Sequence, residues 1–186
     1  MRLRTVFTAL VAGATFLLAP GTGLASASAA ESAAPAGGST VAAPADYAPL
    51  VTKISHSQAT QMFREVGITW SSSGGCSDRN VSTCTSFEQL NLATAQGAQT
   101  LRRASGCAIN ITGGTETGHA GGTYSHWNGY KLDLSLNTCL DSYVTSAFTY
   151  IGLRSDGARM YESAAGNVYA LEGNHWDVVF YNCGGC

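Results

Sequence analysis

The stretch from Ser125 to Asp133 combines residue types that could bind a metal ion. His126 stands seven residues before Asp133, and Gly129 between them lets the backbone turn. A neutral imidazole and a carboxylate are both ligands of Zn²⁺, which binds nitrogen and oxygen at about 2.0–2.2 Å. A second cluster, residues 172–177, reads Glu-Gly-Asn-His-Trp-Asp and could supply a third ligand and a base. The two clusters together predict one metal site.

The first cluster leads into a predicted strand. From Tyr130 onward the residues alternate, with leucines at positions 132, 134 and 136 on one face and Asp133 on the other. This is the period of a half-buried strand. We therefore expect His126 in the loop before the strand and Asp133 on the polar face of the strand.

The remaining pattern predicts helices before and after this strand and a run of strands toward the C-terminus. Helices are expected over residues 57–66, from a capping-box sequence at 85–88 to about 104, and from 138 onward. Strands are expected over 108–112, 159–162, 168–172 and 176–181, with turns at 156–157 and 166–167. This order predicts a single α+β domain, with an antiparallel sheet, helices packed on one face, and a zinc site in a cleft on the sheet.

The N-terminal residues are expected to lie outside this domain. Residues 1–29 have a basic start, a short apolar run and an Ala25-Ser26-Ala27 cleavage signal, which is typical of a signal peptide. The apolar run is too short for a comfortable membrane span, so we expect a secreted protein, extracellular or associated with the cell wall. Residues 30–49, rich in Ala, Pro, Gly and Ser, predict a linker or short pro-segment. Residues 50–186 are long enough for one domain.

Charge and cysteine content indicate which partners and which covalent links to expect. The formal net charge is −2, and loss of the two arginines of the leader leaves 8 basic against 12 acidic residues. Without a basic run, nucleic acid is not an expected partner, and we expect a monomer. Six cysteines in an exported chain predict disulfides, and the expected pairs are Cys76–Cys84, Cys107–Cys139 and Cys183–Cys186. A zinc site at the last pair is the alternative and needs two more thiolates nearby.

The paired motifs SxHxxGxxxD and ExxH resemble those of the zinc D-alanyl-D-alanine carboxypeptidases. Related groups are the D-Ala-D-Ala dipeptidases, the L-alanyl-D-glutamate endolysins and the N-terminal signalling domain of hedgehog. The resemblance is strongest over about residues 109–136 and 169–180. It implies a peptidoglycan stem peptide as the substrate and Zn²⁺ as the cofactor.

Carried across by motif, the resemblance assigns roles to individual residues. His126, Asp133 and His175 are the implied zinc ligands, and Glu172 is the implied general base. Ser125 opens the first motif and belongs to a possible secondary set of site residues. Three protein ligands leave a fourth tetrahedral position for water, as in catalytic zinc sites.

Three points stay open in this assignment. Asp177 points the same way as His175 in a strand and could be the third ligand, with His175 then acting as acid or base. His119, in the glycine-rich loop before the first motif, could be a fourth polar group or a hydrogen bonder that braces the loop. Many family members carry an arginine in this loop; here the loop has none, and Arg154 or Arg159 could serve from elsewhere.

The sequence thus predicts an exported zinc peptidase. A D-alanyl-D-alanine carboxypeptidase is the first expectation, and an endopeptidase cutting a neighbouring bond is the second. The competing hypothesis is a zinc-stabilised binding or signalling module that resembles hedgehog and has no turnover. A third is a disulfide-rich secreted structural protein, in which His126 and Asp133 form a hydrogen-bonded pair without metal.

Overall fold

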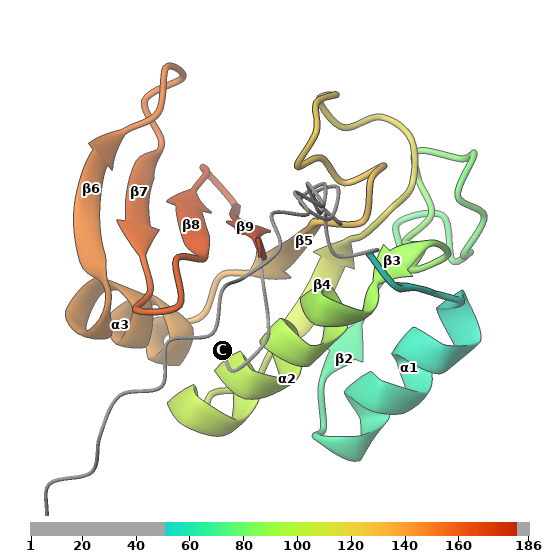
Figure 1. The fold of residues 1–186 in the computed structure, drawn as a ribbon, viewed down its shortest axis with the longest axis horizontal. Coiled ribbons are helices and arrows are strands. Elements are labelled where there is room, and N and C mark those ends of the chain that lie inside the picture. Colours follow the sequence, from blue (N-terminus) through green and yellow to red (C-terminus); the bar gives the residue numbers. More distant parts are fainter. Residues whose placement is uncertain (1–50, 182–186) are drawn as a thin grey trace, which may run out of the picture. The chain divides into compact units, whose positions relative to one another are not determined.

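The computed structural model describes residues 51–181, which form a single α+β domain (Figure 1). Its helices are α1 (His56–Glu65), α2 (Leu92–Ser105) and α3 (Thr138–Ala147). Its strands are β1 (Lys53–Ile54), β2 (Thr69–Trp70), β3 (Leu90–Asn91), β4 (Asn110–Gly113), β5 (Lys131–Ser135), β6 (Thr149–Leu153), β7 (Arg159–Glu162), β8 (Val168–Leu171) and β9 (His175–Val179). The expected signal peptide, linker and Cys183–Cys186 pair lie outside the described residues.

Seven strands form one sheet in the order β2-β4-β5-β9-β8-β7-β6. All neighbours in this sheet are antiparallel except β2 and β4, which are parallel. The predicted α+β class is confirmed, and the parallel pair is the exception to the predicted antiparallel sheet. Strands β5 and β9 are far apart in the chain and adjacent in the sheet, so the sheet itself joins the two polar clusters.

The hydrophobic core lies between the helices and one face of this sheet. Successive side chains of a strand point to opposite faces, and Leu132 and Leu134 of β5 and Trp176 and Val178 of β9 point into that core. Helices α1 and α2 lie over the β2–β4 end of the sheet, and α3 lies at the β6–β8 end (Figure 1). All three helices contribute buried side chains to the same core, among them Phe63, Ala98, Leu101, Leu140 and Val144. The residues that alternate with the core positions of β5 and β9 therefore face away from the helices.

Helix α2 begins later than its sequence predicts. The capping-box prediction at 85–88 is wrong, because this segment forms contacts with other parts of the chain. The carboxylate of Glu88 accepts the backbone N–H of His56 at the start of α1 (3.0 Å), and Phe87 N–H donates to His56 Nδ1 (3.0 Å). Gln89 then adopts a positive φ of 64°, which no helix residue has. The helix starts only at Leu92.

Two disulfides lie within the described residues, and both are among the pairs predicted from the sequence. Cys76–Cys84 closes a polar loop, and Cys107–Cys139 links the segment before β4 to α3. The second bridge spans 32 residues, a loop for which chain entropy predicts stabilisation of about 3–4 kcal/mol. Disulfides of this kind are compatible with an extracellular protein.

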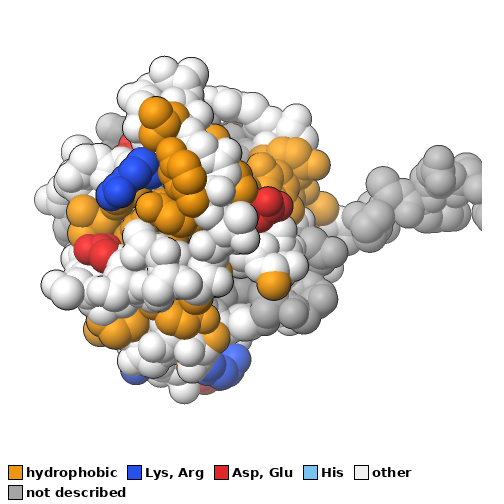
Figure 2. Space-filling model, turned by 90° about the vertical axis from the view of Figure 1, so that its left-hand side faces the viewer, with side chains coloured by type: hydrophobic (Ala, Val, Ile, Leu, Met, Phe, Trp, Pro, Cys, Tyr) orange, Lys and Arg blue, Asp and Glu red, His pale blue; other side chains and the backbone are white. Residues whose placement is uncertain are grey.

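Strand β6 forms one edge of the large sheet. Tyr150, Ile151 and Leu153 of this strand are exposed, and hydrophobic side chains gather on this side of the domain (Figure 2). In the part of the chain that the structure describes, no helix has the length and apolar character needed to cross a bilayer.

Candidate metal centre

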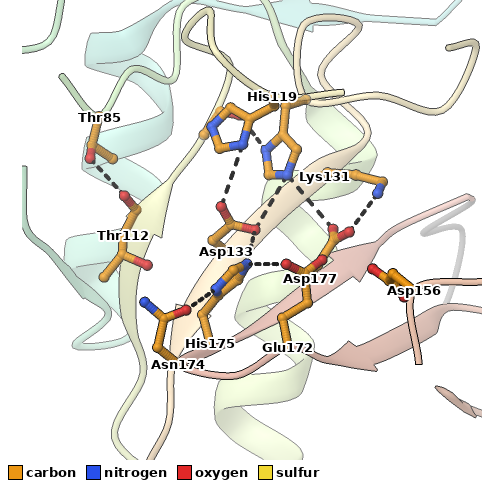
Figure 3. Close-up of polar contacts among 12 residues, drawn as sticks. Thr85, Thr112, His119, Lys131, Asp133, Asp156, Glu172, Asn174, His175 and Asp177 are labelled. Carbon is orange, nitrogen blue, oxygen red and sulfur yellow. Dashed lines mark hydrogen bonds and ion pairs between the residues drawn. The ribbon is translucent and has the colours of Figure 1, made fainter. Parts of the chain in front are cut away.

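The two polar clusters meet on the sheet face that points away from the helices. Asp133 of β5 pairs directly with Asp177 of β9, and Ser135 pairs with His175. His126 lines a cavity at the same place from the loop before β5, and Asp133, His175 and Asp177 lie close together on this face (Figure 3). The cavity has a volume of about 560 Å³, and its lining includes Asp133, His126, His175, Asp177 and Glu172. The strand register therefore brings the predicted metal-binding residues to one place.

His126 is held in the orientation of a metal ligand. The ring is 3% exposed, and its Nδ1–H donates to the carbonyl oxygen of Gly114 at 2.7 Å. A backbone carbonyl on one ring nitrogen fixes the tautomer and leaves the other nitrogen free to coordinate. That nitrogen, Nε2, lies 3.3 Å from Asp133 Oδ1 and 3.7 Å from Asp177 Oδ1.

The two aspartates present oxygens that lack hydrogen bonds. Asp133 Oδ1 and Asp177 Oδ1 are buried and accept none from residues 51–181, which is costly unless a proton or cation lies between them. Burial alone would lower the pKa of His126, but the neighbouring carboxylates of Asp133 and Asp177 outweigh burial and raise it to about 9, so without a metal a proton on the imidazole balances their charge. A metal cation would satisfy the same oxygens. The donor set thus fits a metal ion.

His175 approaches the carboxylate of Asp133 from β9. Its Nε2 lies 3.4 Å from Asp133 Oδ1, and its Nδ1–H donates to Asn174 Oδ1 at 2.8 Å. Two ligands of one tetrahedral zinc are about 3.3 Å apart when each bond is about 2.0–2.1 Å. Asp133 Oδ1 has this separation from both His126 Nε2 and His175 Nε2.

Asp177, the alternative third ligand, has one oxygen engaged elsewhere. Its Oδ2 accepts Lys131 Nζ at 2.6 Å and Arg154 Nη1 at 2.8 Å. Burial would raise the pKa of Asp177, but the charge of nearby His126 and the hydrogen bond and charge of Lys131 outweigh burial and lower it well below its usual value. Asp177 is therefore a carboxylate balanced by two cations, with Oδ1 still facing the cavity.

His119 is part of the same group. His119, His126 and Asp133 place ligand atoms within 4.8 Å of one another, an arrangement that could hold a metal ion. The His119 ring stacks on His126 with centroids 3.8 Å apart, and its Nδ1 lies 3.7 Å from Asp133 Oδ2. The other nitrogen, Nε2, lies 3.2 Å from Glu116 Oε1. His119 thus lies where it can contribute to the site and also brace its loop.

Glu116 is a site residue that the sequence analysis missed. It is 2% exposed, and its carboxylate accepts the backbone N–H groups of Ser86 and Gly114 as well as contacting His119. Burial would raise its pKa, but these hydrogen bonds outweigh burial and lower it. The available signal was an acid inside a run of small residues. The same loop needs a glycine at position 113, because a Cβ on Gly113 would collide with Asp133 Oδ2.

Glu172 lies at the edge of the centre. Its Oε2 is 3.4 Å from His175 Nε2, and its Oε1 forms an ion pair with Arg154. Arg154 enters the cavity from the β6–β7 hairpin and also pairs with Asp156, which together with its other carboxylate partners raises the pKa of the guanidinium further above its usual value. Arg159 is exposed and does not line the cavity. Of the two arginines considered from the sequence, Arg154 is the one at the site.

Ser125 has a structural contact. It is buried, and its hydroxyl accepts the N–H of Asn128 at 3.2 Å. Its carbonyl accepts the N–H of Tyr130 at 3.1 Å. Ser125 does not line the cavity formed by the described residues. Its contacts instead shape the loop that carries His126.

Comparison of the chain with protein-family models, curated proteins and solved structures found no match.

Proposed function

We propose that this protein is a secreted zinc peptidase that hydrolyses peptidoglycan stem peptides, with D-alanyl-D-alanine carboxypeptidase as its first expected activity. One observation carries the proposal. Asp133 Oδ1 accepts no hydrogen bond from the described part of the chain, yet it lies 3.3 Å from His126 Nε2 and 3.4 Å from His175 Nε2. Each of these two separations is that expected for a pair of ligand atoms on one tetrahedral zinc ion.

The donor types favour zinc among the common ions. Two imidazole nitrogens and one carboxylate oxygen are a usual catalytic zinc set, whereas Ca²⁺ and Mg²⁺ prefer oxygen ligands alone. His126 and His175 each have a hydrogen-bond acceptor on Nδ1, from Gly114 and Asn174 respectively. Such partners orient ligating histidines in metal sites. A zinc ion held here would activate water and polarise the scissile carbonyl.

The chain's own residues account for the remaining steps. Glu172 Oε2 is oriented toward the cavity beside His175, where it would take a proton from the attacking water and give it to the leaving amine. Arg154 keeps that carboxylate in place through Oε1. It also supplies a positive charge at the cavity wall, where it would stabilise the oxyanion that develops on the substrate. Arg154 would thus take the role that a loop arginine has in many members of the family.

A zinc-stabilised binding module is the second candidate, and the ion pair between Glu172 and Arg154 favours it. A carboxylate that is committed to a guanidinium is partly withdrawn from proton transfer. In that case the same geometry would bind a peptide without cutting it. Catalysis is the property that separates the two candidates.

The test combines metal content with cleavage. We expect the secreted protein to retain about one zinc and to release D-alanine from D-Ala-D-Ala-terminated peptides, detected by mass spectrometry. Glu172→Gln should retain zinc and fold as wild type but lose at least ~10²-fold in kcat, the lower range of general-base catalysis. Zinc retention with no cleavage of any stem-peptide fragment or intact peptidoglycan would replace the peptidase with the binding module. Equal cleavage by Glu172→Gln would remove Glu172 as the base.

A further inference from the structure

A second cavity opens on the same sheet face, directly beside the metal centre. It has a volume of about 230 Å³ and shares Lys131, Arg154 and Asp177 with the metal cavity. The rest of its lining is apolar or aromatic: Met160, Val168, Ala170, Val179, Tyr124 and Tyr181. A polar metal cavity therefore continues into an apolar pocket.

The strand register explains this change from polar to apolar. Asp133 pairs with Asp177, Asp177 with Ala170, and Ala170 with Met160, so these four residues form one row across β5, β9, β8 and β7. Neighbouring strands are about 4.8 Å apart, which places Ala170 about 5 Å beyond Asp177. The small side chain of Ala170 leaves the hollow, and the longer chain of Met160 closes its far side.

The rim of the pocket carries groups suited to binding. Tyr124 and Tyr181 are 48% and 42% exposed and meet edge to face, with ring centroids 4.7 Å apart. Exposed aromatic rings beside an apolar hollow are typical of binding surfaces. Among the described residues Lys131 Nζ donates one hydrogen bond, to Asp177, and an ammonium has three donors. Lys131 can therefore also bind an oxygen of a ligand.

We propose that this pocket is a specificity subsite for a short aliphatic side chain of the peptide substrate. The volume is below the roughly 300–1,000 Å³ of pockets that take a whole small molecule, so the pocket fits one side chain. An acceptor oxygen of the same substrate residue, carbonyl or carboxylate, binds Lys131. This inference rests on the proposed function, since it names the substrate class of the same site.

The chain offers a reporter that does not depend on catalysis. Of its three methionines, Met160 lines the pocket and Met62 lies on α1, on the opposite side of the sheet. The full chain, zinc-loaded and carrying ¹³C-methyl methionine, is titrated with racemic N-acetyl-leucine, N-acetyl-alanine and N-acetyl-glycine. Met160→Leu assigns the signal. We expect the Met160 methyl to shift most with the leucine derivative and not with the glycine derivative, while Met62 stays unchanged.

Two further arms define the ligand. N-acetyl-leucine amide has a carbonyl oxygen but no carboxylate, so comparing it with N-acetyl-leucine shows which of the two groups binds Lys131. Binding of either compound supports the subsite. Ala170→Val fills the pocket and should weaken N-acetyl-leucine binding about tenfold, the effect of one or two methyl groups in an apolar pocket. Ala164→Val, the same change in the exposed β7–β8 turn, should leave binding unchanged. Zinc content and the Met62 signal verify that each variant folds.

The outcomes separate the subsite from the peptidase. The subsite is overturned if the Met160 methyl signal does not shift with any of the three probes, or if it shifts equally with the glycine derivative. Unchanged N-acetyl-leucine binding in Ala170→Val also overturns it. A Met160 response in a protein that cleaves no peptide supports the subsite and removes the peptidase. Cleavage with equal kcat/KM for glycine and leucine peptides, together with a silent Met160, retains the peptidase and removes the subsite.

Discussion

Protonation of His126 should set how the stability of the metal-free protein depends on pH, and zinc should compete with that proton. The carboxylates of Asp133 and Asp177 overcome the effect of burial and raise the pKa of His126 from 6.5 to about 9. A raised pKa stabilises the folded state fully below pH 6.5, and the stabilisation is lost as the pH rises through about 9. A difference of about 2.5 in pKa corresponds to about 3 kcal/mol.

The assay is chemical unfolding followed by tryptophan fluorescence, with a chelator present, at intervals from pH 6 to pH 10. We expect the unfolding free energy to fall by about 3 kcal/mol across this range. Zinc-loaded protein should lack this fall, because a histidine binds metal only in its neutral form. Zinc binding at pH 7.5 should also release about one proton from His126, measurable by calorimetry in buffers of different ionisation enthalpy.

Two variants make the assay specific to one residue. His126→Gln has no proton to lose there, so the pH dependence between 6.5 and 9 should disappear. His56→Gln is the matched control: the pKa of His56 is lowered, mainly by burial, and its removal should leave the fall intact. A flat profile in the metal-free wild type, or an unchanged profile in His126→Gln, would refute the reasoning.

Two further predictions concern the ligand set. His175→Ala should abolish tight zinc binding, whereas Asp177→Asn should weaken it by about 10–100-fold, the usual effect of a group behind the ligands; the opposite ranking in a competition titration with a chromogenic chelator would assign Asp177 to the metal. Gly113→Ala should displace Asp133 and weaken zinc binding, because its Cβ would collide with Oδ2. Gly121→Ala, where the added Cβ meets nothing within 4 Å, should bind zinc as wild type, and equal affinities for the two variants would contradict the close approach.

The local elements around the site follow from the sequence. Alternation from Tyr130 onward correctly places Asp133 on the polar face of β5 and Leu132 and Leu134 in the core. The turn at Asp156-Gly157 joins β6 to β7 as the sequence predicts. These features depend on neighbours in the chain, so their patterns are visible in a single sequence.

Features that depend on distant partners could not be predicted. The start of α2 was misplaced because Glu88 caps α1 instead of its own segment. Nothing local distinguishes Arg154 from Arg159; the hairpin alone decides that Arg154 enters the cavity. Glu116 is significant because its carboxylate joins the distant Ser86 to Gly114 and His119 of its own loop. The pairing of β5 with β9 is likewise a property of the whole sheet.

One measurement tests the central claim most directly: anomalous diffraction at the zinc edge from crystals of the protein grown with zinc. The account predicts a single strong peak about 2.0–2.2 Å from His126 Nε2, Asp133 Oδ1 and His175 Nε2. A peak held by other residues would contradict the ligand set. The absence of any peak on this face of the sheet would contradict the metal centre itself.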